Sequence, residues 1–273
     1  MKTKISIITV VYNAAAVLEE TILSVLQQDY PHIEYIIIDG GSTDGSVDII
    51  RKYSDRIAYW VSEPDAGVYD AMNKGIRKAT GDWINFMNAG DRFFHPRTLS
   101  TVFENNNYKG YDILYGNVII VSRSGVYLHL EAGKADQLKN CMPFCHQTVF
   151  VRTELAKTYL FDTTFKIAAD YKFFYTVWKA GKKFCKQSFP LAIYTMDGIS
   201  STNSLLEEFA KVNGEKTSLI AKLRSLIIRK IPQWLEKILL YLLKANIITT
   251  LEYENARFER LLESSTKKED DVR

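Results

Sequence analysis

Two aspartates stand where apolar, strand-like stretches of this sequence end in polar turns. Asp39 follows Tyr35–Ile38 and precedes a Gly-Gly-Ser-Thr-Asp-Gly turn, and Asp91 closes the turn after Trp83–Met87. In an open α/β sheet, ligands bind just beyond the carboxyl ends of the strands. A carboxylate there can hold a divalent cation against a diphosphate, or accept hydrogen bonds from a base or ribose. The two aspartates therefore predict a nucleotide-diphosphate site.

Both positions also have a simpler interpretation. The stretch Gly40–Gly45 could be only a turn and helix N-cap, with Asp44 as the cap, although this leaves Asp39 without a role. Asp91 could likewise be only a turn residue. The turn after Asp39 is not Gly-x-Gly-x-x-Gly and has no Walker lysine, which disfavours dinucleotide-binding and P-loop sites.

A third carboxylate, Asp170, opens a predicted helix. There it could cap the helix, or it could act as general base for an incoming hydroxyl group. His146 and Gln147 precede a predicted strand and could line the same cleft, although a lone histidine is more often structural. Three further residues follow Gly67 at a helix N-terminus, a position that suits phosphate or sugar: Tyr69, Asp70 and Asn73.

The elements that must position these residues alternate over the first 110 residues. Apolar runs predict buried strands, and apolar residues at helical spacing predict helices between them, the last over Val68–Ala79. This βαβαβαβ pattern predicts a mostly parallel, doubly wound sheet with right-handed crossovers. The four strands are expected at Ile5–Val11, Ile33–Ile38, Ile57–Val61 and Trp83–Met87.

After Tyr111 the rhythm changes to shorter strands, with a helix near Asp170–Ala180. This half should extend the sheet with antiparallel or mixed strands and form the second wall of a cleft. Its strands are expected at Tyr111–Tyr115, Val118–Val121, Val126–Leu130, Thr148–Val151 and Phe184–Tyr194.

The chain divides into a domain over 1–203 and a helical extension over 204–273, with helices at Leu205–Lys230 and Pro232–Leu262. Residues 211–244 hold eight Lys or Arg and two Glu. The helices could pack on the domain with a solvated basic face. They could equally form a basic amphipathic element on an anionic membrane surface.

The composition excludes several classes of protein. A net charge of +3 in 273 residues gives no argument for nucleic acid. The three cysteines are too few and odd in number for a disulfide framework, and Cys141 with Cys145 and His146 is a zinc half-site without a second half. No apolar run reaches the roughly 18 residues of a spanning helix. We therefore expect a cytoplasmic protein, which could also contact the inner face of the cell membrane.

Taken together, the motifs resemble those of the family 2 glycosyltransferases, an inverting group with the GT-A nucleotide-diphospho-sugar transferase fold, a doubly wound mixed sheet. The resemblance covers roughly residues 4–202, and is strongest to the subgroup that builds capsule, colanic-acid-like or O-antigen repeat units in bacteria. The matching stretches are 6–13, 38–45, 62–67, 70–75, 81–91, 145–147, 169–170 and 197–200.

The resemblance implies a role for each candidate residue. Asp91 would hold Mn2+ or Mg2+, and Asp170 would be the catalytic base. The donor and acceptor pocket would include Tyr69, Asp70, Asn73, His146 and Gln147. The nucleotide would contact Thr9, Tyr12, Asp39, Asp65 and Asn88. One departure stands out: the family's metal motif is usually Asp-x-Asp, whereas this chain has Asn88-Ala-Gly-Asp91, with a single carboxylate.

The sequence thus predicts an inverting glycosyltransferase that moves a sugar from a nucleotide-diphospho-sugar to a hydroxyl acceptor. The expected acceptor is a saccharide on a polyprenyl diphosphate in bacterial surface polysaccharide synthesis. A non-catalytic nucleotide-sugar-binding subunit is the alternative that the thinned metal motif favours. A nucleotidyltransferase would need a basic triphosphate loop after the first strand, and residues 11–17 contain no Lys or Arg.

Overall fold

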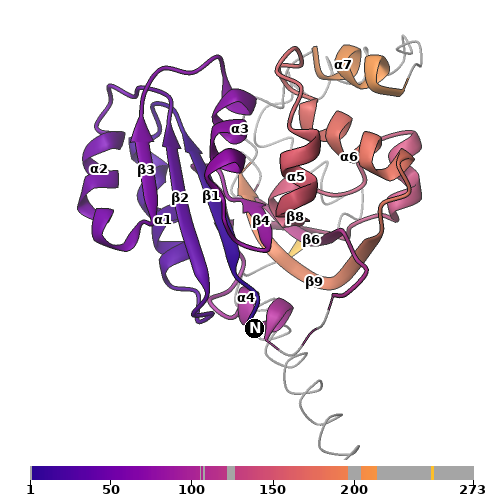
Figure 1. Cartoon of the computed structure of the whole chain (residues 1–273), viewed down its shortest axis with the longest axis horizontal. Helices are drawn as coiled ribbons and strands as arrows, with labels where there is room; N and C mark the ends of the chain where they lie inside the picture. Colours follow the sequence, from indigo (N-terminus) through magenta and orange to yellow (C-terminus); the bar gives the residue numbers. More distant parts are fainter. Residues whose placement is uncertain are drawn as a thin grey trace, which may run out of the picture.

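The computed structural model describes residues 2–104, 106, 108–121, 127–195, 204–213 and 247–248. Its first half alternates strands and helices as the sequence predicts (Figure 1). Strand β1 pairs in parallel with β2 and with β4, and β2 pairs in parallel with β3. The elements are β1 (Ile5–Val11), α1 (Ala15–Leu26), β2 (Ile33–Asp39), α2 (Ser46–Lys52), a 3-10 turn (Ser54–Arg56), β3 (Tyr59–Ser62), α3 (Val68–Lys78) and β4 (Trp83–Phe86).

The second half extends the same sheet with mixed strands, which confirms the predicted fold class. Strand β8 lies antiparallel between β4 and β6, giving the order β10-β7-β6-β8-β4-β1-β2-β3, while β9 pairs with β5 and β6. The elements are β5 (Arg92–Phe93), α4 (Thr98–Phe103), β6 (Ile113–Val121), β7 (Tyr127–Leu130), 3-10 turns at Ala135–Lys139 and His146–Thr148, β8 (Val149–Arg152), α5 (Thr153–Tyr159), α6 (Ala169–Lys179), β9 (Phe184–Thr195), α7 (Ser204–Asn213) and β10 (Ile247–Ile248).

Apart from shifts of one or two residues at the ends of elements, one difference from the predicted strands stands out. The two strands expected at Tyr111–Tyr115 and Val118–Val121 are a single strand, β6. Its pairing with β9 shifts register around Gly116, where an added Cβ would lie 2.7 Å from Leu191 Cδ1. The two strands approach so closely there that glycine is needed. Gly116 therefore marks an irregularity within one strand and does not separate two strands.

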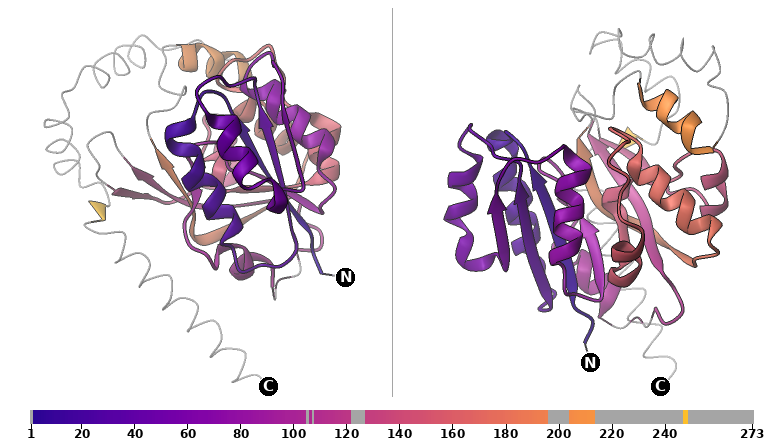
Figure 2. Two further views of the ribbon diagram at one scale, coloured as in Figure 1. Left: turned by 90° about the vertical axis from the view of Figure 1, so that its left-hand side faces the viewer. Right: turned by 45° about the horizontal axis from the view of Figure 1, so that its top comes forward.

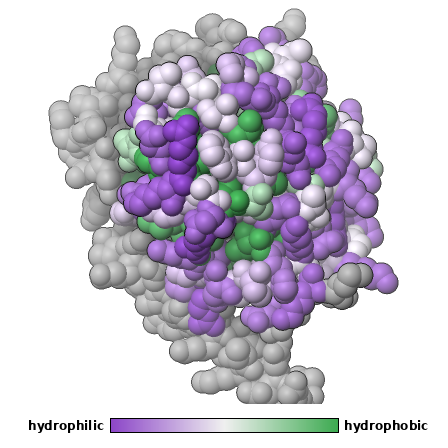
Figure 3. Space-filling model, turned by 60° about the vertical axis from the view of Figure 1, so that its left-hand side comes forward, coloured by the Kyte–Doolittle hydropathy of each residue, from purple (hydrophilic) through white to green (hydrophobic). Residues whose placement is uncertain are grey.

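Helices cover both faces of the sheet and create two apolar cores. Ile8 and Val10 of β1 pack on the side of α3, α5 and α6. Ile7 and Val11 point to the opposite side, towards α1 and α4. This alternation, with both sides apolar, is what a parallel strand between two helical layers requires. The outer face around the edge strand β3 is mainly hydrophilic, with isolated hydrophobic residues (Figure 3).

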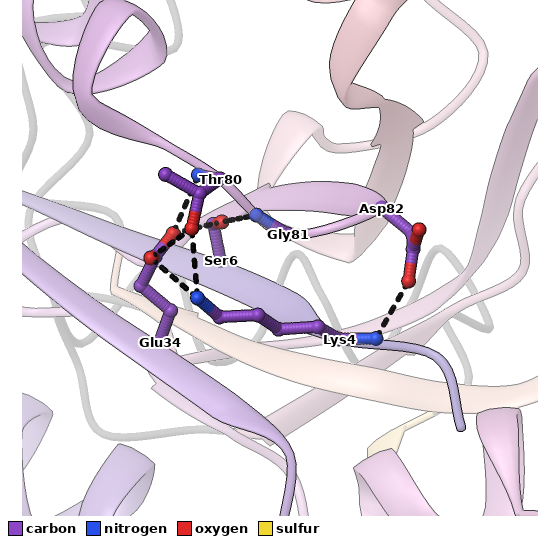
Figure 4. A network of polar contacts seen from close by, with 6 residues as sticks. All are labelled: Lys4, Ser6, Glu34, Thr80, Gly81 and Asp82. Carbon is purple, nitrogen blue, oxygen red and sulfur yellow. Dashed lines mark hydrogen bonds and ion pairs between the residues drawn. The ribbon is translucent and has the colours of Figure 1, made fainter. Parts of the chain in front are cut away.

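At the amino end of the sheet, a polar network ties three elements together (Figure 4). Glu34 of β2 accepts hydrogen bonds from Lys4 Nζ (2.7 Å) and Ser6 Oγ (2.6 Å). The backbone N–H of Thr80 (2.7 Å) and its hydroxyl also donate to Glu34. Burial alone would raise the pKa of Glu34, but the hydrogen bonds from Lys4, Ser6 and Thr80 lower it to about 2. The network therefore joins β1, β2 and the loop before β4 through an ionised carboxylate.

Two pieces of the predicted C-terminal extension contact the main domain. Helix α7 packs on α6, where the rings of Tyr171 and Phe209 lie 4.7 Å apart (Figure 2). Strand β10 pairs antiparallel with β7. The remainder of the two predicted helices, most of the basic segment 211–244 and the stretch Asp197–Ser200 lie outside the described residues. Within the described residues, no helix is long and apolar enough to cross a membrane.

Candidate active site

The candidate site lies at the carboxyl ends of the parallel strands, where the sequence places Asp39. The Asp39 side chain is fully buried, and it accepts hydrogen bonds from the backbone N–H groups of Gly41 (3.1 Å) and Ser42 (2.9 Å). The hydroxyls of Ser42 and Ser62 donate to the same carboxylate. These internal partners fix the turn that follows β2 against the end of β3. Asp39 thus shapes this end of the sheet through hydrogen bonds with other groups of the protein.

Tyr12 and Asp65 meet beside this turn. A Cβ added to Gly40 would lie 2.5 Å from Asp65 Oδ2 and 3.3 Å from Tyr12 Cδ2, so the two side chains flank Gly40. The Tyr12 side chain is 68% exposed. Asp65 also accepts a hydrogen bond from the Gly67 N–H (2.8 Å) through Oδ1. An exposed ring next to a carboxylate provides a stacking face and a hydrogen-bond acceptor, which together suit a flat base with N–H donors.

Thr9 does not line this surface, contrary to the expected nucleotide contact. It is fully buried, and its hydroxyl donates to the Met87 carbonyl (2.7 Å) with the Tyr35 hydroxyl 3.0 Å away. Side chains of a strand alternate between its two faces, and Thr9 lies on the same face of β1 as Ile7 and Val11, the side of α1 and α4. Its hydrogen bonds join β1, β2 and the end of β4, so Thr9 stabilises the strand ends that carry the site.

The turn Asn88–Asp91 brings the second aspartate to the same edge. The Asp91 side chain is 6% exposed, and Gln147 Nε2 donates to its Oδ2 at 3.0 Å. Burial raises the pKa of Asp91 to about 6, against the opposing effects of Gln147, His146 and the Thr195 backbone. Thr21 of α1 holds this turn by donating to the Asp91 carbonyl (2.7 Å) and accepting from the Gly90 N–H (3.0 Å). No motif marks Thr21 in the sequence.

Asn88 offers a second side-chain oxygen in the same turn as Asp91. Its Nδ2 lies 3.2 Å from His146 Nε2, whereas its Oδ1 is buried without a hydrogen-bond partner. An unpaired buried carbonyl oxygen is costly unless a ligand satisfies it. Carboxylate and amide oxygens are ligands that Mn2+ and Mg2+ accept, so this pair fits a hard cation. The described residues contain no group of three or more His, Cys, Asp or Glu side chains that could hold a metal ion unaided.

Asp170 lies at the first turn of α6 and contacts the same region through His146. The carboxyl Oδ2 is 3.3 Å from His146 Nδ1, while Oδ1 accepts from the Tyr171 N–H (2.8 Å) and the Tyr69 hydroxyl (3.2 Å). With the Asn88 amide donating to Nε2, His146 carries its proton on Nδ1 and donates it to Asp170. A continuous chain therefore runs from Asn88 through His146 to Asp170.

The Cys145 thiol and the Tyr69 hydroxyl both have raised pKa values in this region. Burial, followed by the charges of Asp91 and Asp170, raises the pKa of the Cys145 thiol to about 12. Burial and Asp170 also hold the pKa of Tyr69 far above its usual range, so the Tyr69 hydroxyl remains a hydrogen-bond donor.

The remaining two predicted pocket residues have structural partners. Asn73 is buried and makes both of its amide hydrogen bonds with the backbone of Phe161, at 2.8 Å each. Asp70 accepts a hydrogen bond from the Ala66 N–H at 3.1 Å and so ties the loop before α3 to the first turn of that helix. Of the residues expected at the helix N-terminus after Gly67, only Tyr69 contacts Asp170. Asn73 instead secures the segment that leads towards α6.

Comparison with known proteins shows which proteins the chain is similar to. Residues 6–162, more than half of the chain, match the family model "Glycosyl transferase family 2". A PGL/p-HBAD biosynthesis glycosyltransferase of Mycobacterium bovis is 34% identical over 173 residues, which cover 62% of this chain and 67% of that protein. A putative teichuronic acid biosynthesis glycosyltransferase, TuaG, of Bacillus subtilis is 39% identical over 95 residues, 34% of this chain and 38% of TuaG.

Solved structures share the fold at low sequence identity. A shortened form of S. aureus TarS, in complex with UDP-GlcNAc, superposes with a TM-score of 0.61 at 18% identity, over 82% of this chain and 70% of that one. The mannosyltransferase PcManGT of Pyrobaculum calidifontis, in complex with GDP-Man and Mn2+, gives a TM-score of 0.60 at 17% identity, over 81% and 67%. Asp170 lies beyond the stretch that the family model matches.

Proposed function

The chain belongs to glycosyl transferase family 2, and from this premise we propose that it transfers a sugar from a nucleotide-diphospho-sugar to a hydroxyl group with inversion at the anomeric carbon. The observation that carries the proposal is the hydrogen-bonded chain from Asn88 through His146 to Asp170. This chain of contacts connects the turn Asn88–Asp91, which suits a diphosphate, with the carboxylate of Asp170, which suits a base. These contacts support a single site for the two groups that such a displacement needs, a base and a holder of the leaving diphosphate.

Asp170 is the base in this proposal. As the acceptor oxygen bonds to the anomeric carbon, its proton passes to the Asp170 carboxylate, and the bond to the diphosphate oxygen breaks on the opposite face. The Tyr171 N–H and the Tyr69 hydroxyl hold Oδ1, which leaves Oδ2, shared with His146, to receive the proton. General-base assistance of this kind is worth roughly 10²–10⁴-fold in rate.

The donor is held by the other half of the site. The exposed Tyr12 ring would stack on the base while Asp65 accepts hydrogen bonds from the base or ribose. Asp91 and the free Oδ1 of Asn88 are the residues that would hold Mn2+ or Mg2+. Such a cation, when bound, offsets the charge that develops on the departing diphosphate.

The proposed acceptor is a saccharide on a polyprenyl diphosphate at the inner face of the membrane, in the synthesis of a surface polysaccharide such as capsule or O-antigen. Two observations support it: the excess of Lys and Arg in residues 211–244, and relatives whose names refer to teichuronic acid and PGL biosynthesis. Basic segments are attracted to anionic lipid surfaces. Sedimentation with anionic liposomes, comparing the full chain with a variant carrying Gln at all eight basic positions, tests the membrane contact. Equal binding would count against it.

A panel of UDP-, GDP- and dTDP-sugars with Mn2+, Mg2+ or EDTA tests the activity itself. We expect slow release of free nucleotide from one donor class, dependent on the cation, and an inverted anomer in the product when its configuration is read by NMR. A retained anomer would contradict the mechanism. Binding of a donor without any release of nucleotide would favour a non-catalytic binding subunit, the role that the single-carboxylate turn Asn88–Asp91 also permits.

A further inference from the structure

A carboxyl group from helix α7 is buried against the segment that leads into α6. Glu208 is 8% exposed, and it accepts hydrogen bonds from three successive backbone N–H groups. Its Oε1 accepts from Lys166 (2.9 Å), and its Oε2 accepts from Ile167 (2.9 Å) and Ala168 (2.8 Å). Three converging donors on one buried carboxyl group make this a specific contact, because each donor would otherwise be left unsatisfied.

The same segment is held from its other side by helix α3. The Tyr69 hydroxyl donates to the Ile167 carbonyl at 2.5 Å and also contacts Asp170 Oδ1 at 3.2 Å. Ala168 is the N-cap of α6, and its carbonyl accepts from the Lys172 N–H at 2.9 Å. Asp170 lies two residues beyond this segment, so its position depends on how the segment is clamped between Glu208 and Tyr69.

We propose that Glu208 is a positioning residue for Asp170, and that helix α7 is therefore needed to hold the catalytic base in place. This inference rests on the proposed function, because it assigns Glu208 to the base of that reaction. Helix α7 lies well beyond residues 6–162, which match the family model. Glu208 itself does not touch the reacting atoms; it acts by holding the backbone from which Asp170 projects.

Glu208→Gln is the informative substitution. The glutamine keeps the shape and one acceptor oxygen, but its amide group brings a donor to a place where the protein already presents backbone donors. The segment 166–168 should shift, and a displacement of about 1 Å at a catalytic group can lower the rate on the order of 100-fold. Glu154→Gln is the matched control, since it makes the same change at an exposed carboxyl group, on α5.

The test measures kcat and KM for sugar transfer, together with donor Kd and melting temperature, for the full chain and these variants. We expect Glu208→Gln to lower kcat by roughly 10- to 100-fold with donor Kd within about twofold of wild type. Glu154→Gln should behave as wild type. In an Asp170→Asn background, Glu208→Gln should cause no further loss, because its effect passes through Asp170.

Two results would overturn the inference: an unchanged kcat in Glu208→Gln, or a loss that multiplies fully with that of Asp170→Asn, which would indicate general loosening of the fold. If Glu208→Gln does not fold, Glu208→Asp, which withdraws the carboxyl group by one methylene, is judged by the same two criteria. The proposed function fails separately, if wild-type turnover does not depend on Asp170 at all.

Discussion

Glu34 at the amino end of the sheet and Asp91 at its carboxyl end are both buried carboxyl groups, but their sets of hydrogen-bond partners differ. At the amino end, Glu34 is 8% exposed and receives four hydrogen bonds, one of them from the ammonium group of Lys4. At the carboxyl end, Asp91 is 6% exposed and has one side-chain donor, Gln147. The pKa of Glu34 is lowered to about 2, whereas burial raises that of Asp91 to about 6.

Burial alone therefore does not distinguish a structural carboxylate from a functional one; the set of partners does. Glu34 is complete within the protein, and its charge stabilises the fold. Asp91, beside the unpaired Oδ1 of Asn88, is left short of positive charge and of donors. Such a site gains most from a cation that the protein does not itself supply. The comparison can be tested by changing either end and measuring both stability and activity.

The largest expected effect comes from Asp91→Asn. Turnover should fall on the order of 100-fold or more, because the group that would help neutralise the leaving diphosphate is lost. In EDTA at pH 7 the same variant should be more stable to urea than wild type, by up to about 3 kcal/mol, since ionising the buried Asp91 is costly and Asn avoids this. Lower stability together with normal turnover would contradict the assignment.

Glu34→Gln should show the opposite pattern. The free energy of unfolding at pH 7 should drop by about 3 kcal/mol, because the ionised carboxylate and its bond to Lys4 are lost. Donor Kd and kcat should stay near the wild-type values at a temperature where the variant is folded. Urea unfolding and donor titration measure the two properties. A variant with normal stability would show that the network in Figure 4 contributes little.

The pH dependence of stability should separate the two ends further. Glu34 has a lowered pKa when folded, so its contribution is present above pH of about 4.5 and is lost as the pH falls towards about 2. Asp91 has a raised pKa when folded, so its contribution to stability is present below a pH of about 4 and is lost as the pH rises through about 6. Unfolding curves of wild type and Glu34→Gln should therefore converge in acid. Curves that stay apart below pH of about 2 would disprove this account of Glu34.

The smallest effect is expected from Tyr12→Ala. Its ring is exposed, so the melting temperature should not change, while donor affinity should weaken by about 1–2 kcal/mol through loss of stacking on the base. Isothermal titration with the free nucleotide measures this directly, and Tyr12→Phe, which keeps the ring, is the control. Equal affinities for Ala and Phe would place the base elsewhere.

Much of this architecture could be predicted from the sequence, because buried parallel strands are continuous apolar runs and polar turns follow them. The positions of Asp39 and Asp91 followed from that pattern, and that of Asp170 from the start of a predicted helix. The partners of each side chain did not. Thr9 and Asn73 lie on the right elements, yet their hydrogen bonds are with Met87 and Phe161, residues far away in the sequence.

Glu208 shows the same limit more clearly. It lies 38 residues after Asp170 (208 minus 170), on a helix with no motif, and only the packing of α7 on α6 brings it to residues 166–168. In the sequence, Glu208 cannot be distinguished from an acidic residue on a solvated helix face. Contacts between distant segments of this kind depend on the tertiary structure, which local spacing does not encode.

The most direct test of the account is the turnover of Asp170→Asn with the donor identified by the nucleotide-sugar panel. We predict that kcat falls by roughly 10²–10⁴-fold while donor Kd stays as in wild type, because Asp170 moves a proton and does not hold the nucleotide. Unchanged turnover, or a loss of donor binding as large as the loss of rate, would contradict the assignment of Asp170 as the base.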